Sequence, residues 1–198
     1  MFYKGEPMDI TKITADELYC FVEGDYGIYE ITSDIATAPS IFAELAQVYF
    51  HYPFYITFEG YDDVRSEIIT AKNIEWIGDI GTVLTSQGNA IYHKGVPSFR
   101  ATIASAMDFM HFLRHNYRYV VENNFLVATQ HKHVMYKPVI QDTHTQSFAY
   151  LNALMHTHFL MFGERGQSVI IGTKTEATEE ALYTKLLGYR HWQLSSTD

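Results

Sequence analysis

The chain has 198 residues, of which 47% are hydrophobic and 19% charged, so it has enough apolar material for a folded core and is not of disordered composition. Its formal net charge of −9 excludes a general nucleic-acid binder, which needs basic side chains to meet phosphates. No apolar run approaches the ~20 residues that span a bilayer and no secretory leader is visible, so we expect a cytoplasmic-type protein without membrane insertion.

The residue types also bear on disulfides and on partners. Cys20 is the only cysteine, which excludes an intramolecular disulfide, and we expect it to be a small buried hydrophobic residue. The 15 Tyr and 13 Phe residues are of types favoured at interfaces as well as in cores. This aromatic richness favours protein partners or a homo-oligomer.

The first half of the chain predicts short helices and strands in alternation. A capping-box pattern beginning at Thr14 predicts a helix over 15–23, and Pro39-Ser40 opens a second helix over 41–50. Strands are predicted over 28–31, 54–58 and 67–77, and a β-hairpin over 82–85 and 90–93.

The second half predicts two long helices and several further strands. Pro97-Ser98 opens a helix over 99–115, in which Ile103, Met107 and Met110 fall at helical spacing. Further elements are predicted as strands over 119–121, 125–128, 133–140 and 169–171, and as helices over 145–162 and 175–187.

Together these elements predict an α+β fold with a mostly antiparallel mixed sheet flanked by helices. The final strand–helix–strand–helix run would supply one parallel crossover. No repeat, low-complexity tract or linker divides the chain, so we expect a single domain over 1–198, in which 1–60 is a candidate N-terminal elaboration.

The C-terminal third carries a family resemblance. A strand over 134–140, a loop, a helix over 146–162, a strand over 169–171 and a helix over 176–187 are predicted to follow one another. The chain then leaves the last helix through Leu187-Gly188-Tyr189-Arg190. Over residues 132–192 this order and this ending resemble the core of the GNAT family of acyl-CoA N-acyltransferases. The resemblance implies a GNAT-like fold and acetyl-CoA as the ligand.

The loop that would bind the cofactor departs from the family pattern. In the family, an R/Q-x-x-G-x-G/A motif brings backbone N–H groups at a helix start to the CoA pyrophosphate. Here the loop has no glycine and no arginine, and Asp142 would repel a pyrophosphate. Thr145, Gln146 and Ser147 are the residues that would offer N–H groups, the alternative being that Thr143 or Thr145 simply caps the helix.

Tyr183 lies near the position of the family's tyrosine, which protonates the departing thiolate. It precedes Gly188 by five residues, where the family usually has four, and Lys174, Thr175 and Glu176 occupy the region of the family's asparagine. The resemblance therefore implies Tyr183 as a general acid, and an ordinary packed helix residue is the alternative.

These departures favour a GNAT-like protein that acts mainly as a structural or interaction module, with catalysis weakened or lost and no cofactor. The chain is similar in size and character to GNAT-like proteins of tailed bacteriophages, which predicts a virion component if it is phage-encoded. The alternative is an active acetyl-CoA-dependent N-acetyltransferase that uses Thr145, Gln146, Ser147 and Tyr183.

The ten histidines suggest a second alternative, a His-based metalloprotein. His131 and His133 would share one face of a strand, with His144 close behind, and imidazole suits Zn²⁺ or Fe²⁺. His156 and His158 would point apart on a helix. There is no H-E-x-x-H motif, no H-x-x-x-H pair with carboxylates and no cysteine cluster, so no metal ligand is assigned.

Overall fold

The computed structural model describes residues 9–18, 20–32, 36–60, 73–87, 90–122, 125–141, 144–163 and 166–195. The helices in these ranges are α1 (Ala38–Tyr49), α3 (Ala106–Glu122) and α4 (Glu179–Ser195), with a 3-10 turn η1 (Ala15–Glu17). The strands are β1 (Ile10–Lys12), β2 (Phe21–Glu23), β3 (Gly27–Thr32), β4 (Phe54–Glu59), β5 (Ile74–Gln87), β6 (Ala90–Ile103), β7 (Leu126–Thr129), β8 (Met135–Gln141), β9 (His144–Asn152), β10 (His158–Phe162) and β11 (Ser168–Thr173). No helix in the described ranges is long and apolar enough to cross a membrane.

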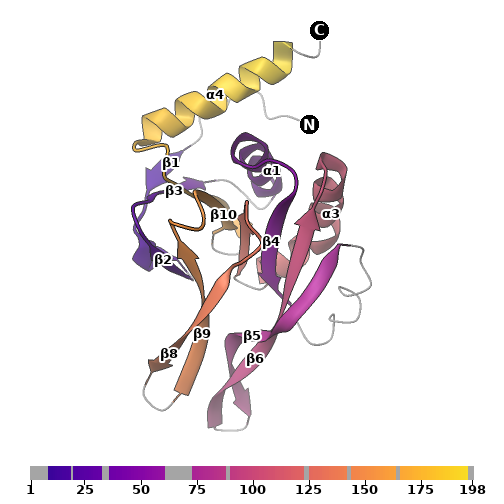
Figure 1. Cartoon of the computed structure of the whole chain (residues 1–198), viewed down its shortest axis with the longest axis vertical. Helices are drawn as coiled ribbons and strands as arrows, with labels where there is room; N and C mark the ends of the chain where they lie inside the picture. Colours follow the sequence, from indigo (N-terminus) through magenta and orange to yellow (C-terminus); the bar gives the residue numbers. More distant parts are fainter. Residues whose placement is uncertain are drawn as a thin grey trace.

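The strands form two sheets (Figure 1). The larger has eight strands in the order β1-β3-β11-β10-β7-β4-β6-β5, and its described neighbours all run antiparallel. The smaller sheet has the order β2-β9-β8, in which β2 runs parallel to β9 and β8 runs antiparallel to β9. Three helices with mostly antiparallel sheets confirm the predicted α+β class.

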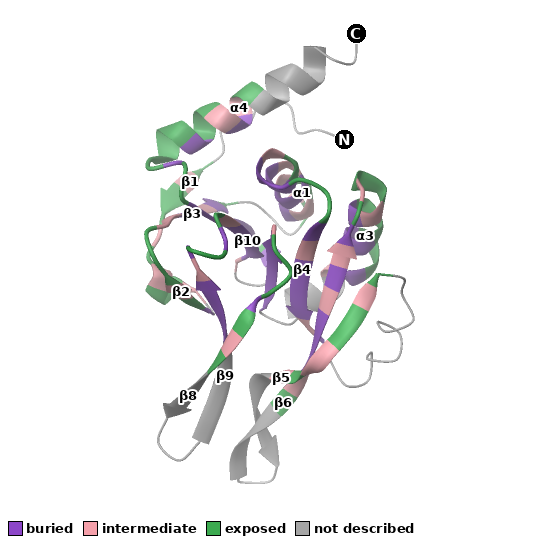
Figure 2. Ribbon diagram, in the orientation of Figure 1, coloured by how far each residue is buried: buried purple, intermediate pink, exposed green. Residues whose placement is uncertain are grey.

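The large sheet has an apolar core on each face. On one face it packs against the three helices, through residues such as Phe42 of α1, Phe109 of α3 and Leu182 of α4. On the other face it packs against the small sheet, which contributes Ala149 and Leu151 of β9. The fold is therefore three layers deep, and Figure 2 shows the strands of the middle layer, such as β4 and β10, largely buried.

Strand β10 contributes side chains to both apolar cores. Leu160 and Phe162 lie in the core beneath the helices, whereas Phe159 and Met161 lie in the core beneath the small sheet. Because both faces are covered, residues 159–162 are continuously apolar instead of alternating with polar residues, and only His158 at the start of the strand is polar. Fully burying a side chain of this kind is worth about 1.5–3 kcal/mol.

Helix α1 follows directly from its sequence. Pro39 stands in the first turn, where the missing N–H leaves no hydrogen bond unmade. Phe42, Leu45 and Tyr49 recur at helical spacing and are buried. The Phe42 ring stacks on Phe162 with ring centres 4.4 Å apart, so this helix is fixed to the middle of the sheet.

Several predicted elements agree with the structure. The predicted helices over 41–50 and 175–187 correspond to α1 and α4, and the predicted strands over 54–58 and 169–171 correspond to β4 and β11. The hairpin over 82–93 lies within the longer hairpin β5–β6. The predicted strand over 67–77 lies partly outside the described residues.

The helix predicted over 145–162 is wrong. These residues form β9, a turn and β10, and β9 pairs with β8 as a hairpin. The strand–helix–strand order on which the family resemblance rested is therefore absent from the described residues, as is its parallel crossover. The one described parallel pair joins β9 to β2, in the first part of the chain, and not to another strand of the C-terminal third.

Three smaller predictions also fail. The helix predicted over 99–115 begins only at Ala106, because residues 99–103 form the end of β6. Residues 119–121, predicted as a strand, belong to α3. The helix predicted over 15–23 is reduced to the turn η1, after which residues 21–23 form β2.

Two hairpins extend past the strands beside them. In β5–β6, residues 81–87 pair with 90–96, whereas β4 pairs only with residues 98–103 of β6. In β8–β9, residues 138–141 pair with 144–147, whereas β2 pairs only with residues 150–152 of β9. Figure 1 shows both hairpins at the lower end of the molecule, and β5 contacts β9. We call residues 81–96 and 138–147 the two-hairpin arm.

Candidate functional site

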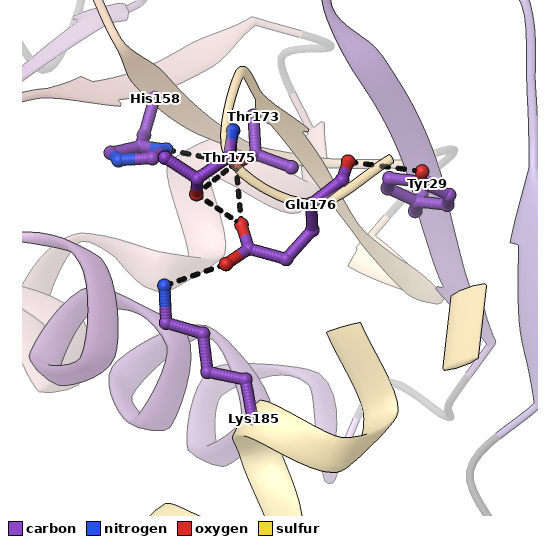
Figure 3. Close-up of polar contacts among 6 residues, drawn as sticks. All are labelled: Tyr29, His158, Thr173, Thr175, Glu176 and Lys185. Carbon is purple, nitrogen blue, oxygen red and sulfur yellow. Dashed lines mark hydrogen bonds and ion pairs between the residues drawn. The ribbon is translucent and has the colours of Figure 1, made fainter. Parts of the chain in front are cut away.

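The densest polar cluster of the described residues lies where β11 leads into α4. Figure 3 shows it built around Glu176, in the loop between these two elements. The other members come from β3, α1, β10, β11, the same loop and α4, and they are Tyr29, Tyr49, His158, Thr173, Thr175 and Lys185. We call this set the Glu176 cluster.

The Glu176 carboxylate is held on both oxygens. Its Oε2 accepts hydrogen bonds from the hydroxyls of Thr173, at 2.7 Å, and of Thr175. Its Oε1 accepts a charge-assisted bond from Lys185 Nζ at 2.7 Å. Burial alone would raise the pKa of Glu176, but these hydrogen bonds outweigh it and lower the pKa to about 2. The group is therefore a carboxylate at neutral pH and is not available as a general acid.

His158 is bound into the same cluster as a neutral imidazole. Its Nδ1 lies 3.0 Å from Thr173 Oγ1. The single hydroxyl proton of Thr173 is donated to Glu176, so Nδ1 must carry the proton of this contact and Nε2 keeps the lone pair. Burial, above all, lowers the pKa of His158 and keeps the ring neutral.

Two tyrosines and the lysine close the cluster. The Tyr49 ring packs on His158 with centres 4.9 Å apart, and Lys185 Nζ lies 4.1 Å from the centre of the Tyr49 ring. Burial, and then the neighbouring charge of Glu176, raises the pKa of Tyr49. The Tyr29 hydroxyl donates to the backbone oxygen of Glu176. These contacts tie α4 to α1 and to three strands, which is chiefly a structural role.

A second polar cluster lies between the two sheets, at the root of the two-hairpin arm. Glu59 of β4 stands opposite Ser98 of β6, and burial raises the pKa of Glu59 to about 7. Arg100 of β6 forms an ion pair with Glu75 of β5 at 3.1 Å, and Glu75 also meets Lys132 at 3.2 Å. These contacts link β5, β6 and the segment leading into β8.

The residues predicted to form an acetyl-CoA site belong to two elements that pack on opposite faces of the large sheet. Tyr183 lies on α4 with 36% of its surface exposed, and α4 packs into the core beneath the helices through Leu182. Thr145, Gln146 and Ser147 lie in β9, whose buried residues belong to the core on the other face of the large sheet. These three residues do not begin a helix, so the N–H groups on which the pyrophosphate hypothesis relied belong to a strand paired with β8. Their side chains, and residues 142–143, lie outside those that the structure describes.

The histidines considered for the metalloprotein alternative are also arranged differently from the sequence-based expectation. His131 and His133 precede β8 and do not share a strand face. His156 is buried, and its Nε2 lies 3.0 Å from the backbone oxygen of His133. Within the described ranges, no group of three or more His, Cys, Asp or Glu residues is placed to hold a metal ion. The prediction that Cys20 is buried is confirmed.

Comparison with known proteins adds no family to this geometry. No family model, curated protein or solved structure matches the chain.

Sequence reasoning missed the Glu176 cluster. Its members are spread from β3 to α4, and Tyr29 and Glu176 are more than a hundred residues apart in the chain, so no local motif joins them. The one local signal is Thr173-Lys174-Thr175-Glu176, in which two hydroxyls stand just before a carboxylate at the end of an apolar strand. Hydroxyls in such positions often bond to neighbouring groups, which would have pointed to this loop.

Proposed function

We propose that this chain is a structural module that associates with a second copy of itself through the two-hairpin arm. The observation that carries the proposal is the arm itself, because its strands pair only with each other among the described residues. A two-stranded hairpin standing alone is at best marginally stable in water. An arm of this length is better supported when another surface covers it.

The composition of the arm supports a covered state. Residues 81–96 contain one charged residue, Lys94, and residues 138–147 contain one, Asp142. The whole chain is 19% charged and carries a net charge of −9, so it repels other copies, but the arm is locally neutral. Natural sheet edges that stay free are usually protected by charges or prolines, and residues 81–92 contain neither.

A second copy suits this surface on grounds of symmetry. β5 is the last strand of the large sheet and β8 the last strand of the small one, so β5 offers a row of backbone N–H and C=O groups, and β8 offers a row that is interrupted at Pro138, which has no N–H. An antiparallel pair of identical edges is self-complementary about a two-fold axis. The same strand edge can therefore serve both partners of a homodimer.

The test shortens one hairpin without changing its register. Deleting residues 83–86 together with 91–94 removes four matched pairs, and Gly81↔Val96 and Gln87↔Ala90 are kept. Each strand loses an even number of residues, so the remaining side chains keep their faces. The matched control is Leu154→Glu, which changes a 92% exposed apolar side chain in the turn after β9, away from the arm.

Light scattering after size-exclusion chromatography gives the readout. We expect the wild type and Leu154→Glu to form dimers or larger species at about 100 μM, and the shortened variant to be monomeric with unchanged far-UV circular dichroism. A Kd near this concentration corresponds to about −5.5 kcal/mol, which a modest interface supplies. Wild-type protein that is monomeric at this concentration would overturn the proposal, as would a shortened variant that associates equally well.

The remaining predictions from the sequence stand as predictions. The GNAT-like fold, the virion setting and the acetyl-CoA-dependent acyltransferase rest on the ending of the chain from 169 to 192 and on its general character. Calorimetry with millimolar acetyl-CoA tests the acyltransferase alternative directly, because that alternative requires measurable heat.

A further inference from the structure

Helix α3 carries two histidines on its outer side. His111 and His115 are four residues apart, so they lie one turn apart on the same helix face. Both are exposed, because Phe109, Phe112 and Leu113 take the side that packs on the large sheet. Their ring centres are 4.1 Å apart, and the ring planes are inclined by 34°.

A contact to the backbone fixes the tautomer of His115. Its Nδ1 lies 2.8 Å from the backbone oxygen of His111. A carbonyl oxygen can only accept, so this contact places the proton on Nδ1 and leaves the lone pair on Nε2. Histidines that bind metal ions usually hold their other ring nitrogen in this way, which orients the ring. His115 therefore has the tautomer and the restraint of a metal ligand.

The spacing of the two rings fits a shared ion. With metal–nitrogen bonds of about 2.1 Å, each ring centre would lie roughly 3.2 Å from the ion. Ring centres 4.1 Å apart would then subtend about 80° at an ion shared by both rings, which is nearer to the roughly 90° between neighbouring ligands of a square-planar Cu²⁺ or Ni²⁺ site than to a tetrahedral angle. We passed over this H-x-x-x-H pair in the sequence because we required carboxylates beside the two histidines. The carboxylate one turn earlier, Asp108, accepts a hydrogen bond from Ser105 at the start of the helix.

We propose that His111 and His115 form a two-histidine site for a late first-row transition-metal ion. Imidazole ligands suit Cu²⁺, Ni²⁺ and Zn²⁺, and the Irving–Williams order makes Cu²⁺ the ion bound most tightly. Water completes the coordination, since no described cluster of three or more ligands exists. The ion clamps two successive turns of α3 and so favours the folded state.

The test uses tag-free protein titrated with CuCl₂ in a calorimeter. Alanine at either position should lower the affinity at least about tenfold, a loss typical even of changes in outer-shell partners. The matched control is His131→Ala, an exposed histidine outside the pair. Wild-type protein at 100 times Kd should gain about 5–10 °C in Tm, and a variant with tenfold weaker binding should gain about half as much at the same Cu²⁺ concentration.

Two outcomes would overturn this site. One is unchanged Cu²⁺ affinity in both His111→Ala and His115→Ala; the other is loss of binding in His131→Ala. Electron paramagnetic resonance of the unmodified protein makes the result independent of variant folding, since the site requires coupling to two imidazole nitrogens. A spectrum with one nitrogen ligand or none would also refute it.

Discussion

Glu59 gives the sharpest prediction, because its environment ties stability to pH. Burial raises its pKa from 4.5 to about 7 in the folded protein. Between these values the unfolded chain releases the proton while the folded protein keeps it, so stability falls as pH rises. Each pKa unit is worth about 1.4 kcal/mol, and the whole range therefore corresponds to roughly 3 kcal/mol.

Glu59→Gln imitates the protonated side chain at every pH. We expect it to match the wild type near pH 4 and to be more stable by roughly 3 kcal/mol at pH 8, which is about 6–12 °C in Tm for a chain of this size. Urea unfolding followed by circular dichroism at steps between pH 4 and pH 8 measures the difference. The matched control is Glu180→Gln, at an exposed acid in the first turn of α4. The reasoning would be refuted if the difference in free energy of unfolding between the wild type and Glu59→Gln did not change between pH 4 and pH 8.

Two further substitutions and one labelling experiment test the packing and the Glu176 cluster. Thr173→Val removes a hydrogen bond to the buried Glu176 carboxylate and should lower the free energy of unfolding by about 2–3 kcal/mol. This loss should shrink as pH falls from 4.5 toward about 2, where Glu176 becomes protonated. Urea titrations that show no loss of stability at pH 7 would contradict the prediction. Gly172→Ala places a methyl group 2.0 Å from a carbon of the Phe159 ring and should lower the free energy of unfolding by about 1–3 kcal/mol or more. An unchanged urea midpoint would contradict this and would show that the strand can shift to accommodate the methyl group. Burial raises the pKa of the Cys20 thiol to about 12, so a thiol reagent at pH 8 should label it only in denaturant, and rapid labelling of native protein would speak against its burial.

The elements that could be predicted from the sequence are those with local signals. α1 has a proline in its first turn and an apolar stripe at helical spacing, and both are visible without any knowledge of the rest of the fold. The helix predicted over 145–162 failed for the opposite reason. Residues 159–162 are apolar throughout because both faces of β10 are buried, and such a run has no period that distinguishes a strand from a helix.

The candidate sites lay beyond sequence reasoning because they depend on which strands become neighbours. Glu176 is joined to Tyr29 directly, and to His158 through Thr173, only after β3, β10 and β11 lie side by side. Glu59 acquires its raised pKa only when β6 and the small sheet cover it. His111 and His115 form the exception, because their spacing on one helix is enough to place them together.

The position of β11 governs when this protein can fold during synthesis. β11 lies between β3 and β10 in the large sheet, yet it pairs with a strand made roughly 140 residues earlier. While the ribosome is still adding residues 33 to 167, β1 and β3 have no connection to the rest of the sheet. A nascent chain thus exposes two unpaired edges until β11 emerges, and the risk of misassembly lasts until that strand joins them.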